Sequence, residues 1–272
     1  MRTLRTEALI LRAVDFGESD RIVHLLTPHT GRLTAIAKGA KRSVKRFGGT
    51  LDFFNHLRVQ LVLPRTSQMA RLEQTRLLGT FDGLRTRPRS FALGCYLLEL
   101  LDRLSPEGGA PRDLDGLFVF ALRALGTLER RTPDTRLRTL LELCALDALG
   151  LRPELRRCVR CGKDVEGPEV GFSIPDGGPV CEGCRGAVHD LLPIHLGTLR
   201  ALEQGLRLGI ERADRLALPP RALEEARRVV GRFERFHVGV ELRSQRFLEQ
   251  ILQEPARRGA EGRAGASMKQ ID

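Results

Sequence analysis

Short apolar runs separated by turn residues dominate the first 80 positions of the chain. Three such runs lie at residues 8–11, 22–26 and 33–37, with glycine- or proline-containing segments between them. From residue 56 to 63, apolar and polar positions alternate, which indicates a strand with one buried face. Several short strands with turns at intervals of about 8 to 12 residues predict a small barrel or sandwich.

The apolar period changes to that of a helix after residue 80. A helical region opens at residues 90–104, and the apolar positions between residues 114 and 128 follow the i, i+3, i+4, i+7 rule of an amphipathic helix. Another helix is predicted at about 134–149, where Gly150 and Pro153 stop it. Further helices are predicted at about 193–209, 220–238 and 244–252.

Two segments fit neither period. Residues 154–190 are rich in Cys, Gly and Pro, and residues 254–272 have almost nothing apolar to bury. With 272 residues, the chain is long enough for two or three compact units. We therefore predict a multidomain α+β protein with a β domain at 1–82 and an α-helical domain at 83–253. A cysteine-rich segment is inserted in the latter at 156–188, and a disordered tail is expected at 254–272.

Four of the six cysteines form two C-x-x-C pairs, Cys158 with Cys161 and Cys181 with Cys184, and 19 residues separate the pairs. Two residues between cysteines let both sulfur atoms face one point, and the glycine-rich segment between the pairs can fold back. Four thiolates arranged in this way suit a tetrahedral Zn²⁺ ion and leave no position open for a catalytic water. The spacing predicts one structural zinc ion; a redox-active dithiol or an iron site is the alternative.

Positive charge is concentrated near the N-terminus. The net charge is +11, and residues 1–80 hold 14 Lys or Arg against six Asp or Glu. Five cations stand within nine residues without an acid among them: Lys38, Lys41, Arg42, Lys45 and Arg46. Such a run, expected as an exposed loop or turn at the rim of the barrel, can follow the phosphates of a nucleic acid. A merely solvated loop is the alternative.

Aromatic and basic residues near this run add candidate contacts. Phe47 follows the run directly, so we predict that its ring stacks on a base, and Phe53 and Phe54 are weaker candidates for the same role. A place in the core is the alternative for each of the three rings. If the run does not bind phosphates, a second arginine cluster is the next candidate. It consists of Arg85, Arg87 and Arg89.

Several functions are disfavoured. The sequence has no Walker A loop, no G-x-G-x-x-G after a strand, no H-E-x-x-H and no G-x-S-x-G, so we expect no enzyme. Charged residues interrupt every apolar run before it could span a bilayer, and the N-terminus lacks a secretory pattern. A cytoplasmic protein without membrane contact is therefore expected. Cys95 and Cys144, on apolar faces of predicted helices, are expected in the core.

Several short stretches are distinctive in combination, although none is sufficient alone. They are ALILR (8–12), FGESDR (16–21), TPHTGRLTAIAK (27–38), GAKR (39–42), RFGG (46–49), YLLELL (96–101), LGLRPE (149–154) and CVRCG (158–162). Through them the chain, apart from its tail, resembles the RecO family of bacterial recombination mediators.

This resemblance implies an N-terminal OB-fold barrel and a helical domain with an inserted zinc-binding segment. It also implies binding of single- and double-stranded DNA, annealing of complementary strands, and action with RecR that helps RecA displace single-strand-binding protein. Family members contact the acidic C-terminal tail of single-strand-binding protein through the helical domain. A nucleoid-associated location follows from these partners, and annealing is expected to need no ATP.

Two other classes of function stay open at this stage. One is a zinc-ribbon enzyme that cleaves or modifies nucleic acid, and the other is an adaptor whose basic surface binds an acidic protein and never DNA. The leading hypothesis is a DNA-binding repair mediator without catalytic activity.

Overall fold

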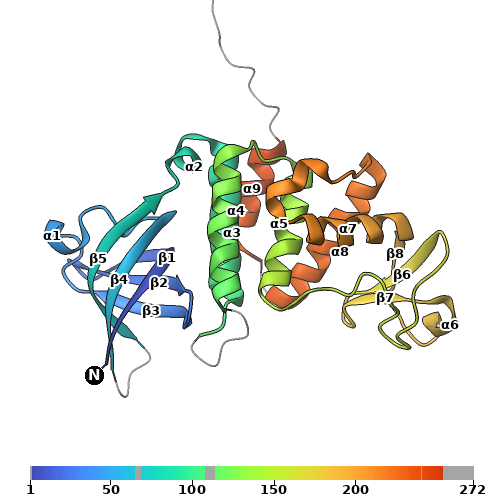
Figure 1. Cartoon of the computed structure of the whole chain (residues 1–272), viewed down its shortest axis with the longest axis horizontal. Helices are drawn as coiled ribbons and strands as arrows, with labels where there is room; N and C mark the ends of the chain where they lie inside the picture. Colours follow the sequence, from blue (N-terminus) through green and yellow to red (C-terminus); the bar gives the residue numbers. More distant parts are fainter. Residues whose placement is uncertain (1, 65–68, 108–113, 240, 254–272) are drawn as a thin grey trace, which may run out of the picture.

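The computed structural model describes residues 2–64, 69–107, 114–239 and 241–253. Figure 1 shows a β-barrel at one end, a bundle of helices in the middle, and a small sheet at the other end. The predicted order of a β domain followed by helices is thus confirmed. The tail at 254–272, which we expected to be disordered, lies outside the described residues.

The N-terminal strands close into a barrel with the order β1-β2-β3-β5-β4. Their bounds are β1 (Arg2–Phe16), β2 (Asp20–Thr27), β3 (Gly31–Ala37), β4 (Asn55–Leu63) and β5 (Ala70–Thr80). The pair β3–β5 is parallel and the other four pairs are antiparallel. Because β1 is long and contains a register shift, its first half pairs with β4 and its second half with β2.

The strand β5 was not singled out by the sequence pattern. Its only inward positions are Ala70, Leu72 and Thr75, because a second register shift against β4 breaks the alternation. Polar residues therefore outnumber the apolar ones along the strand. The four apolar runs at 8–11, 22–26, 33–37 and 56–63 all lie inside observed strands.

The helices agree closely with the predicted segments. They are α2 (Asp82–Thr86), α3 (Pro88–Leu104), α4 (Leu114–Arg130), α5 (Thr135–Ala148), α7 (Leu196–Leu208), the 3₁₀ helix η1 (Ile210–Arg215), α8 (Pro220–Val238) and α9 (Arg243–Gln253). Local chemistry explains the ends of α5. The Asp134 side chain accepts a hydrogen bond from the Leu137 amide at 2.7 Å, and Gly150 adopts a φ of +76° just beyond its end. None of the helices in the described part of the chain combines the length and apolarity needed to cross a bilayer.

The cysteine-rich segment is more regular than its sequence suggested. We name residues 151–195 the cysteine module; it contains β6 (Glu169–Ser173), β7 (Gly178–Val180), α6 (Glu182–Arg185) and β8 (Leu192–His195). The three strands form one sheet in the order β7-β6-β8. We expected irregular structure up to residue 190, which was wrong. The helix expected at about 193–209 is observed as α7, but it begins at Leu196 because residues 192–195 form β8. Strands of three to five residues are too short for an apolar period to reveal them.

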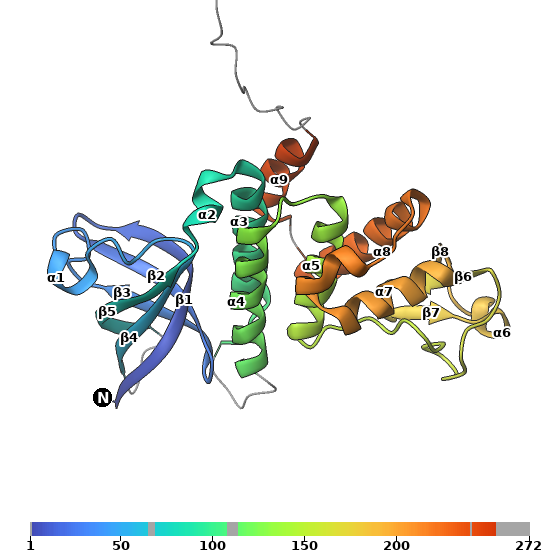
Figure 2. The ribbon, with the colours of Figure 1, turned by 45° about the horizontal axis from the view of Figure 1, so that its top comes forward.

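The barrel is joined to the helices by both apolar and polar contacts. Leu9, Leu11 and Leu26 belong to the same buried cluster as the leucines of α3 and α4. His24 Nδ1 lies 2.6 Å from Oδ1 of Asp102 on α3. Figures 1 and 2 both place α3 and α4 directly beside the barrel. The orientation of the barrel is therefore set by this interface.

Candidate nucleic-acid interface and metal centre

The basic run forms a turn after β3 and then the four-residue helix α1 (Val44–Phe47). Asp20 Oδ1 accepts a hydrogen bond from the Gly39 amide at 2.8 Å, and the Lys41 amide donates to the Ser19 carbonyl at 2.9 Å. The guanidinium of Arg46 donates to the Lys38 carbonyl at 2.7 Å. The run is thus an ordered turn, as one of the two expected forms, followed by a short helix that we did not expect, and it is held against the β1–β2 hairpin.

Two cations of the run have acidic neighbours on that hairpin. Lys41 Nζ lies 3.0 Å from Asp15, and a guanidinium nitrogen of Arg42 lies 3.8 Å from Glu18. Hydrogen bonds from Lys41 and then from Arg21 hold the pKa of Asp15 below its usual value. Exposed pairs of this kind are weak and screened by salt, so a phosphate can replace the carboxylate.

The exposed cations that form no close ion pair are the strongest candidates for contact with phosphates. In the described part of the chain, Lys38 and Lys45 make no ion pair, and both are exposed. Arg46 is half-buried, with hydrogen bonds to the Ser43 hydroxyl and to a carbonyl. The structure therefore brings the five predicted cations together at one end of the barrel. Lys45 and Lys38 are exposed there and form no close ion pair among the described residues, although the charge of Lys38 helps to lower the pKa of Asp20.

The predicted role of Phe47 in base stacking was wrong. Its side chain is only 2% exposed and packs with Leu51 in the interior of the barrel. The guanidinium of Arg46 covers the ring at 4.9 Å from its centroid. Because α1 closes one end of the barrel, the face of the helix that carries Phe47 points inward, and the cations lie on the other faces.

The two later phenylalanines and the alternative arginines serve the interface between barrel and helices. Phe54 is fully buried and packs edge-on against Phe91 of α3, whereas Phe53 is partly exposed. Arg85 donates to Asn55 Oδ1 at 2.9 Å, and Arg87 donates to the Gly83 carbonyl at 3.1 Å. These arginines are engaged in structural contacts and are poor candidates for gripping phosphates.

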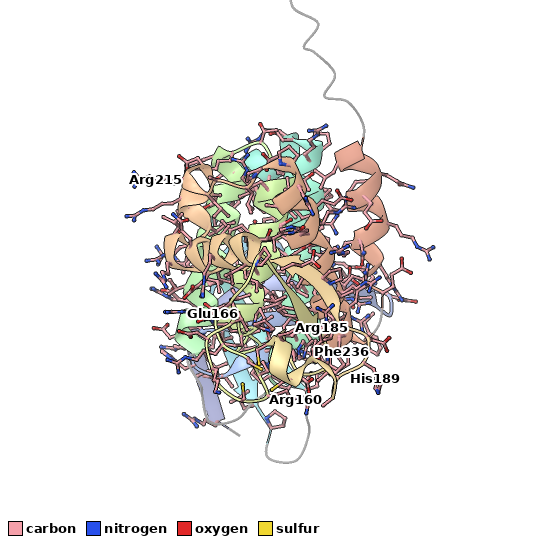
Figure 3. The ribbon with its side chains drawn as sticks, turned by 90° about the vertical axis from the view of Figure 1, so that its right-hand side faces the viewer. Arg160, Glu166, Arg185, His189, Arg215 and Phe236 are labelled. Atoms are coloured by element: carbon pink, nitrogen blue, oxygen red, sulfur yellow. The ribbon has the colours of Figure 1, made fainter. Side chains whose placement is uncertain are left out.

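The four cysteines of the two C-x-x-C pairs meet at the outer end of the cysteine module. Their sulfur atoms all lie within 4.8 Å of one another, and the Cys161 and Cys181 sulfurs are 3.6 Å apart. Cys158 is buried, Cys161 is exposed, and Cys181 and Cys184 are intermediate. Figure 3 looks onto this end, where Arg160 and Arg185, each next to one cysteine pair, are labelled. The four sulfurs are placed so that they could hold a metal ion.

The surroundings of the four sulfurs act in opposite directions on Cys158 and Cys184. Burial alone would raise the pKa of Cys158, but amide hydrogens of Cys181, Arg160 and Cys161 point at its sulfur and lower the pKa to about 6. Hydrogen bonds that the Cys184 thiol donates to Cys181 and Cys161 raise its own pKa to about 12. Four thiolates so close together repel one another, and a metal cation at their centre removes that repulsion.

The first cysteine knuckle is anchored on the small sheet. The Val159 amide donates to the Pro179 carbonyl at 3.0 Å, and the Cys158 amide donates to the Lys163 carbonyl at 2.7 Å. A Cβ atom on Gly178 would lie 2.5 Å from the Val159 side chain, so only glycine fits at this crossing. The backbone around Cys158, the strand β7 and the pair Cys181 and Cys184 that follows β7 therefore hold one another in position.

The remaining cysteines are not part of this centre. Cys144 is buried and Cys95 is half-buried, and both pack against the helical core. Burial raises the pKa of each thiol to about 12, which makes both unreactive at neutral pH. The prediction that they are core residues agrees with these positions.

Known proteins match this chain over nearly its whole length. Residues 1–81 match the family model "Recombination protein O N terminal" and residues 85–246 match "Recombination protein O C terminal". The chain belongs to the RecO family. The "DNA repair protein RecO" of Anaeromyxobacter sp. (strain K) is 36% identical over 252 residues, which cover 92% of this chain and 98% of that protein. That of Myxococcus xanthus is 36% identical over 248 residues (90% and 96%), and that of Roseiflexus sp. is 32% identical over 252 (93% and 87%).

The β1–β2 hairpin of this RecO-family chain contributes residues that the sequence reasoning did not assign. Asp15, Ser19 and Asp20 hold the basic run in place, and Phe16 beside them is 52% exposed. The stretch FGESDR carried the family resemblance, but the sequence alone did not indicate that it contacts a run some 20 residues later. The antiparallel pairing of β2 with β3, in which Arg21 is the register partner of Ala37, brings the two turns together.

Proposed function

We propose that this RecO-family DNA repair protein is a recombination mediator that binds single- and double-stranded DNA. In this proposal the barrel is an OB-fold, and the protein anneals complementary strands without ATP. It acts with RecR to help RecA load on DNA covered by single-strand-binding protein. It is not an enzyme, and it works on chromosomal DNA in the cytoplasm.

One observation carries the proposal. Five cations gather at one end of the barrel, and among the described residues neither Lys38 nor Lys45 lies within ion-pair distance of a carboxylate, although the charge of Lys38 helps to lower the pKa of Asp20. A strand order of 1-2-3-5-4 with a parallel β3–β5 pair is consistent with an OB-fold, in which loops at the barrel rim bind nucleic acid. Cations that neutralise the phosphates of two strands lower the repulsion between them. This is sufficient physical work for annealing.

We propose that the metal is zinc and that its role is structural. A Zn–S distance of about 2.3 Å places tetrahedral thiolates about 3.8 Å apart, and the separation of 3.6 Å between Cys161 and Cys181 is close to that value. All four ligand positions would be taken by sulfur. A zinc ion would fix the outer end of the cysteine module and supply no chemistry to DNA.

For the acidic tail of single-strand-binding protein, we propose a groove between β1 and the helices α3 and α9. Its floor includes Leu11 and Leu98, and its mouth carries Arg12, Arg103 and Arg243. The two acids that also line it are occupied. Glu99 accepts hydrogen bonds from the amides of residues 243 and 244, and Asp102 is bound by His24 and Arg32. The guanidinium groups are therefore left to face an acidic segment.

The decisive test is strand annealing by the purified protein in the absence of nucleotide. Two complementary strands, labelled as a fluorescence donor and acceptor, should pair faster with protein than without it. In a parallel reaction with magnesium, intact strands should be recovered, because cleaved or modified DNA would support the enzyme hypothesis. No association with any oligonucleotide at low salt would support the adaptor hypothesis and overturn the proposal.

A further inference from the structure

The four sulfurs of the four-cysteine centre differ in their access to solvent. Cys158 is 2% exposed and belongs to the buried cluster that the cysteine module shares with α7 and α8. Cys181 and Cys184 are half-buried and pack against the same cluster, whereas Cys161 is exposed. A reagent dissolved in water therefore reaches the sulfur of Cys161 before the other three.

A surface turn gives Cys161 this position. The Gly162 amide donates to the Cys158 carbonyl at 2.8 Å, and Gly162 adopts a φ of +74°, which favours glycine. In the same turn, the side chain of Val159 packs against the buried cluster. The chain thus directs Cys158 and Val159 toward the interior of the cysteine module and leaves Cys161 at its surface.

Exposure is the main difference in reactivity among the four sulfurs when all of them hold a metal. A cysteine sulfur that coordinates a metal is a thiolate at neutral pH, and the thiolate is the form that oxidants attack. With all four sulfurs in that form, the most accessible one reacts first. Cys95 and Cys144 lie outside the centre and pack against the helical core, so we expect neither to compete.

Cys181 is placed to react with an oxidised Cys161. Its sulfur lies 3.6 Å from the sulfur of Cys161, although the two residues belong to different C-x-x-C pairs. A disulfide bond holds its sulfurs about 2 Å apart, so a movement of less than about 2 Å brings these two together. Cys181 is fixed between β7 and α6. The exposed turn that carries Cys161 is therefore the part that moves.

We propose that Cys161 is an oxidation site, at which a peroxide joins Cys161 to Cys181 in a disulfide and so releases the metal. This inference rests on the proposed zinc ion and concerns the residues that hold it. The Cys161 thiolate attacks one oxygen of hydrogen peroxide, an S–O bond forms, the O–O bond breaks, and hydroxide leaves. The Cys181 thiolate then attacks the sulfur of this sulfenic acid, an S–S bond forms, and the second hydroxide leaves.

The products explain both the loss of the metal and its reversal. The two thiolates together give up two electrons, and the peroxide takes them up as its oxygen–oxygen bond is cleaved. Only Cys158 and Cys184 remain as thiolates, and two ligands are too few to hold a structural zinc ion. The new bond still joins the first C-x-x-C pair to the second, so the two pairs stay together. Reduction by a dithiol therefore restores the four ligands.

The test treats the zinc-loaded full chain with hydrogen peroxide and follows the release of zinc with a coloured chelator. Free thiols are then alkylated, and mass spectrometry of the digested protein locates the disulfide. We expect about one zinc ion per chain to be released, together with a disulfide between Cys161 and Cys181. Dithiothreitol followed by added zinc should restore the bound metal.

Two histidine variants separate the role of Cys161 from that of the other ligands. Histidine also binds zinc, so Cys161→His and Cys184→His each keep four ligands, but an imidazole cannot form a disulfide. Cys161→His should release zinc at least about tenfold more slowly than the wild type. Cys184→His retains the exposed thiolate and should release zinc at least about fivefold faster than Cys161→His. Cys95→Ser, outside the centre, should behave as the wild type.

The location of the disulfide in the wild type decides the question even if a histidine variant binds zinc poorly. A disulfide that excludes Cys161, or equal rates of release from the two histidine variants, would overturn the inference and leave the proposed zinc centre standing. A wild type that binds no zinc would overturn the proposed metal and this inference with it.

Discussion

The barrel and the cysteine module are both small β units, yet their surfaces differ in charge and in exposed apolar area. Residues 1–80 hold 14 Lys or Arg against six Asp or Glu, whereas residues 151–195 hold six against seven. The barrel exposes Val14 and Phe16 to solvent. The cysteine module instead buries Val170 and Phe172 in one cluster with α5, α7 and α8.

This difference separates a unit that acts on a partner from a unit that braces the fold. A surplus of cations and an open apolar face attract an external polyanion, whereas a near-neutral unit with its apolar side chains buried has no such surface. Four thiolates around one divalent cation would add a net charge of about −2 to the module. That charge would repel phosphates, so we expect the cysteine module to contribute to stability and little to DNA affinity.

The largest expected effect that tests this division of roles is the loss of the metal. Cys181→Ser removes one of four ligands, and we expect bound zinc to fall from one ion per chain to nearly none, with a lower melting temperature. Affinity for DNA should stay within about twofold, because the barrel shares no core with the module. Zinc is measured by atomic spectroscopy. Cys95→Ser, outside the cluster, is the control and should keep its metal.

Stoichiometric zinc in Cys181→Ser would contradict the four-cysteine centre. A large loss of DNA affinity in a variant that remains folded would contradict the division between the two units.

The next effect concerns the aromatic residues of the barrel. Phe47→Ala empties a buried site and should lower the free energy of unfolding by about 3 to 5 kcal/mol, whereas the exposed Phe16→Ala should change it by about 0.5 kcal/mol or less. Denaturant titration of both variants measures this contrast. Equal stabilities would mean that the ring of Phe47 is not part of the barrel core.

These two rings show what the sequence pattern could and could not predict. The spacing of the cysteines and the clustering of the cations are local, so both candidate sites could be predicted from the sequence. In the sequence, an aromatic residue beside cations gives the same pattern whether its ring points outward to solvent or inward to the core. The direction of the Phe47 ring depends on how α1 closes the barrel, and that of the Phe16 ring depends on the register shift in β1. Neither feature can be recognised from the residues next to the ring in the sequence.

The fold, like the candidate sites, could be predicted only in part from the sequence. Helices such as α8 were predicted to the residue, because their apolar period spans many turns and glycine follows their ends. The strands β6, β7 and β8 were missed because they are short and their partners are distant in the sequence. The hydrogen bonds between the β1–β2 hairpin and the basic run were beyond the sequence for the same reason.

A smaller expected effect concerns the stability of the helices that join the barrel to the cysteine module. Glu234 of α8 and Glu142 of α5 are both buried, and the hydroxyl of Tyr96 on α3 lies within hydrogen-bond distance of a carboxyl oxygen of each. Burial, and then the charge of Glu142, raise the pKa of Glu234 from an ordinary 4.5 to about 8. The folded protein therefore keeps a proton that the unfolded chain has lost between these two values.

Stability should consequently fall as the pH rises from about 4.5 toward 8, by at most about 1.4 kcal/mol per pH unit for one proton. Glu234→Gln should remove this component, so that the variant gains on the wild type as the pH increases through the window. Glu224→Gln, exposed on the same helix, is the control. Parallel pH profiles for the wild type and Glu234→Gln would show that Glu234 is ionised throughout.

The smallest effect that we predict is a change in the salt dependence of DNA affinity when cations are removed from the barrel. Lys38→Ala with Lys45→Ala removes the two exposed cations of the basic run that form no close ion pair among the described residues. For a single strand, each lost phosphate contact lowers the slope of log affinity against log salt by about 0.7, so the slope should fall by about 1.4. At 0.1 M salt this corresponds to a loss of affinity of about 25-fold.

The cysteine module supplies the matched control, Arg160→Ala with Arg185→Ala, which removes two exposed cations at the opposite end (Figure 3). Both double variants lower the net charge by the same amount, so a difference between them reports where the charge lies and not how much there is. If the control flattens the salt dependence as strongly as the barrel variant, phosphates contact both ends. The cysteine module would then be a second DNA-binding surface, and the division of roles between the two β units would be wrong.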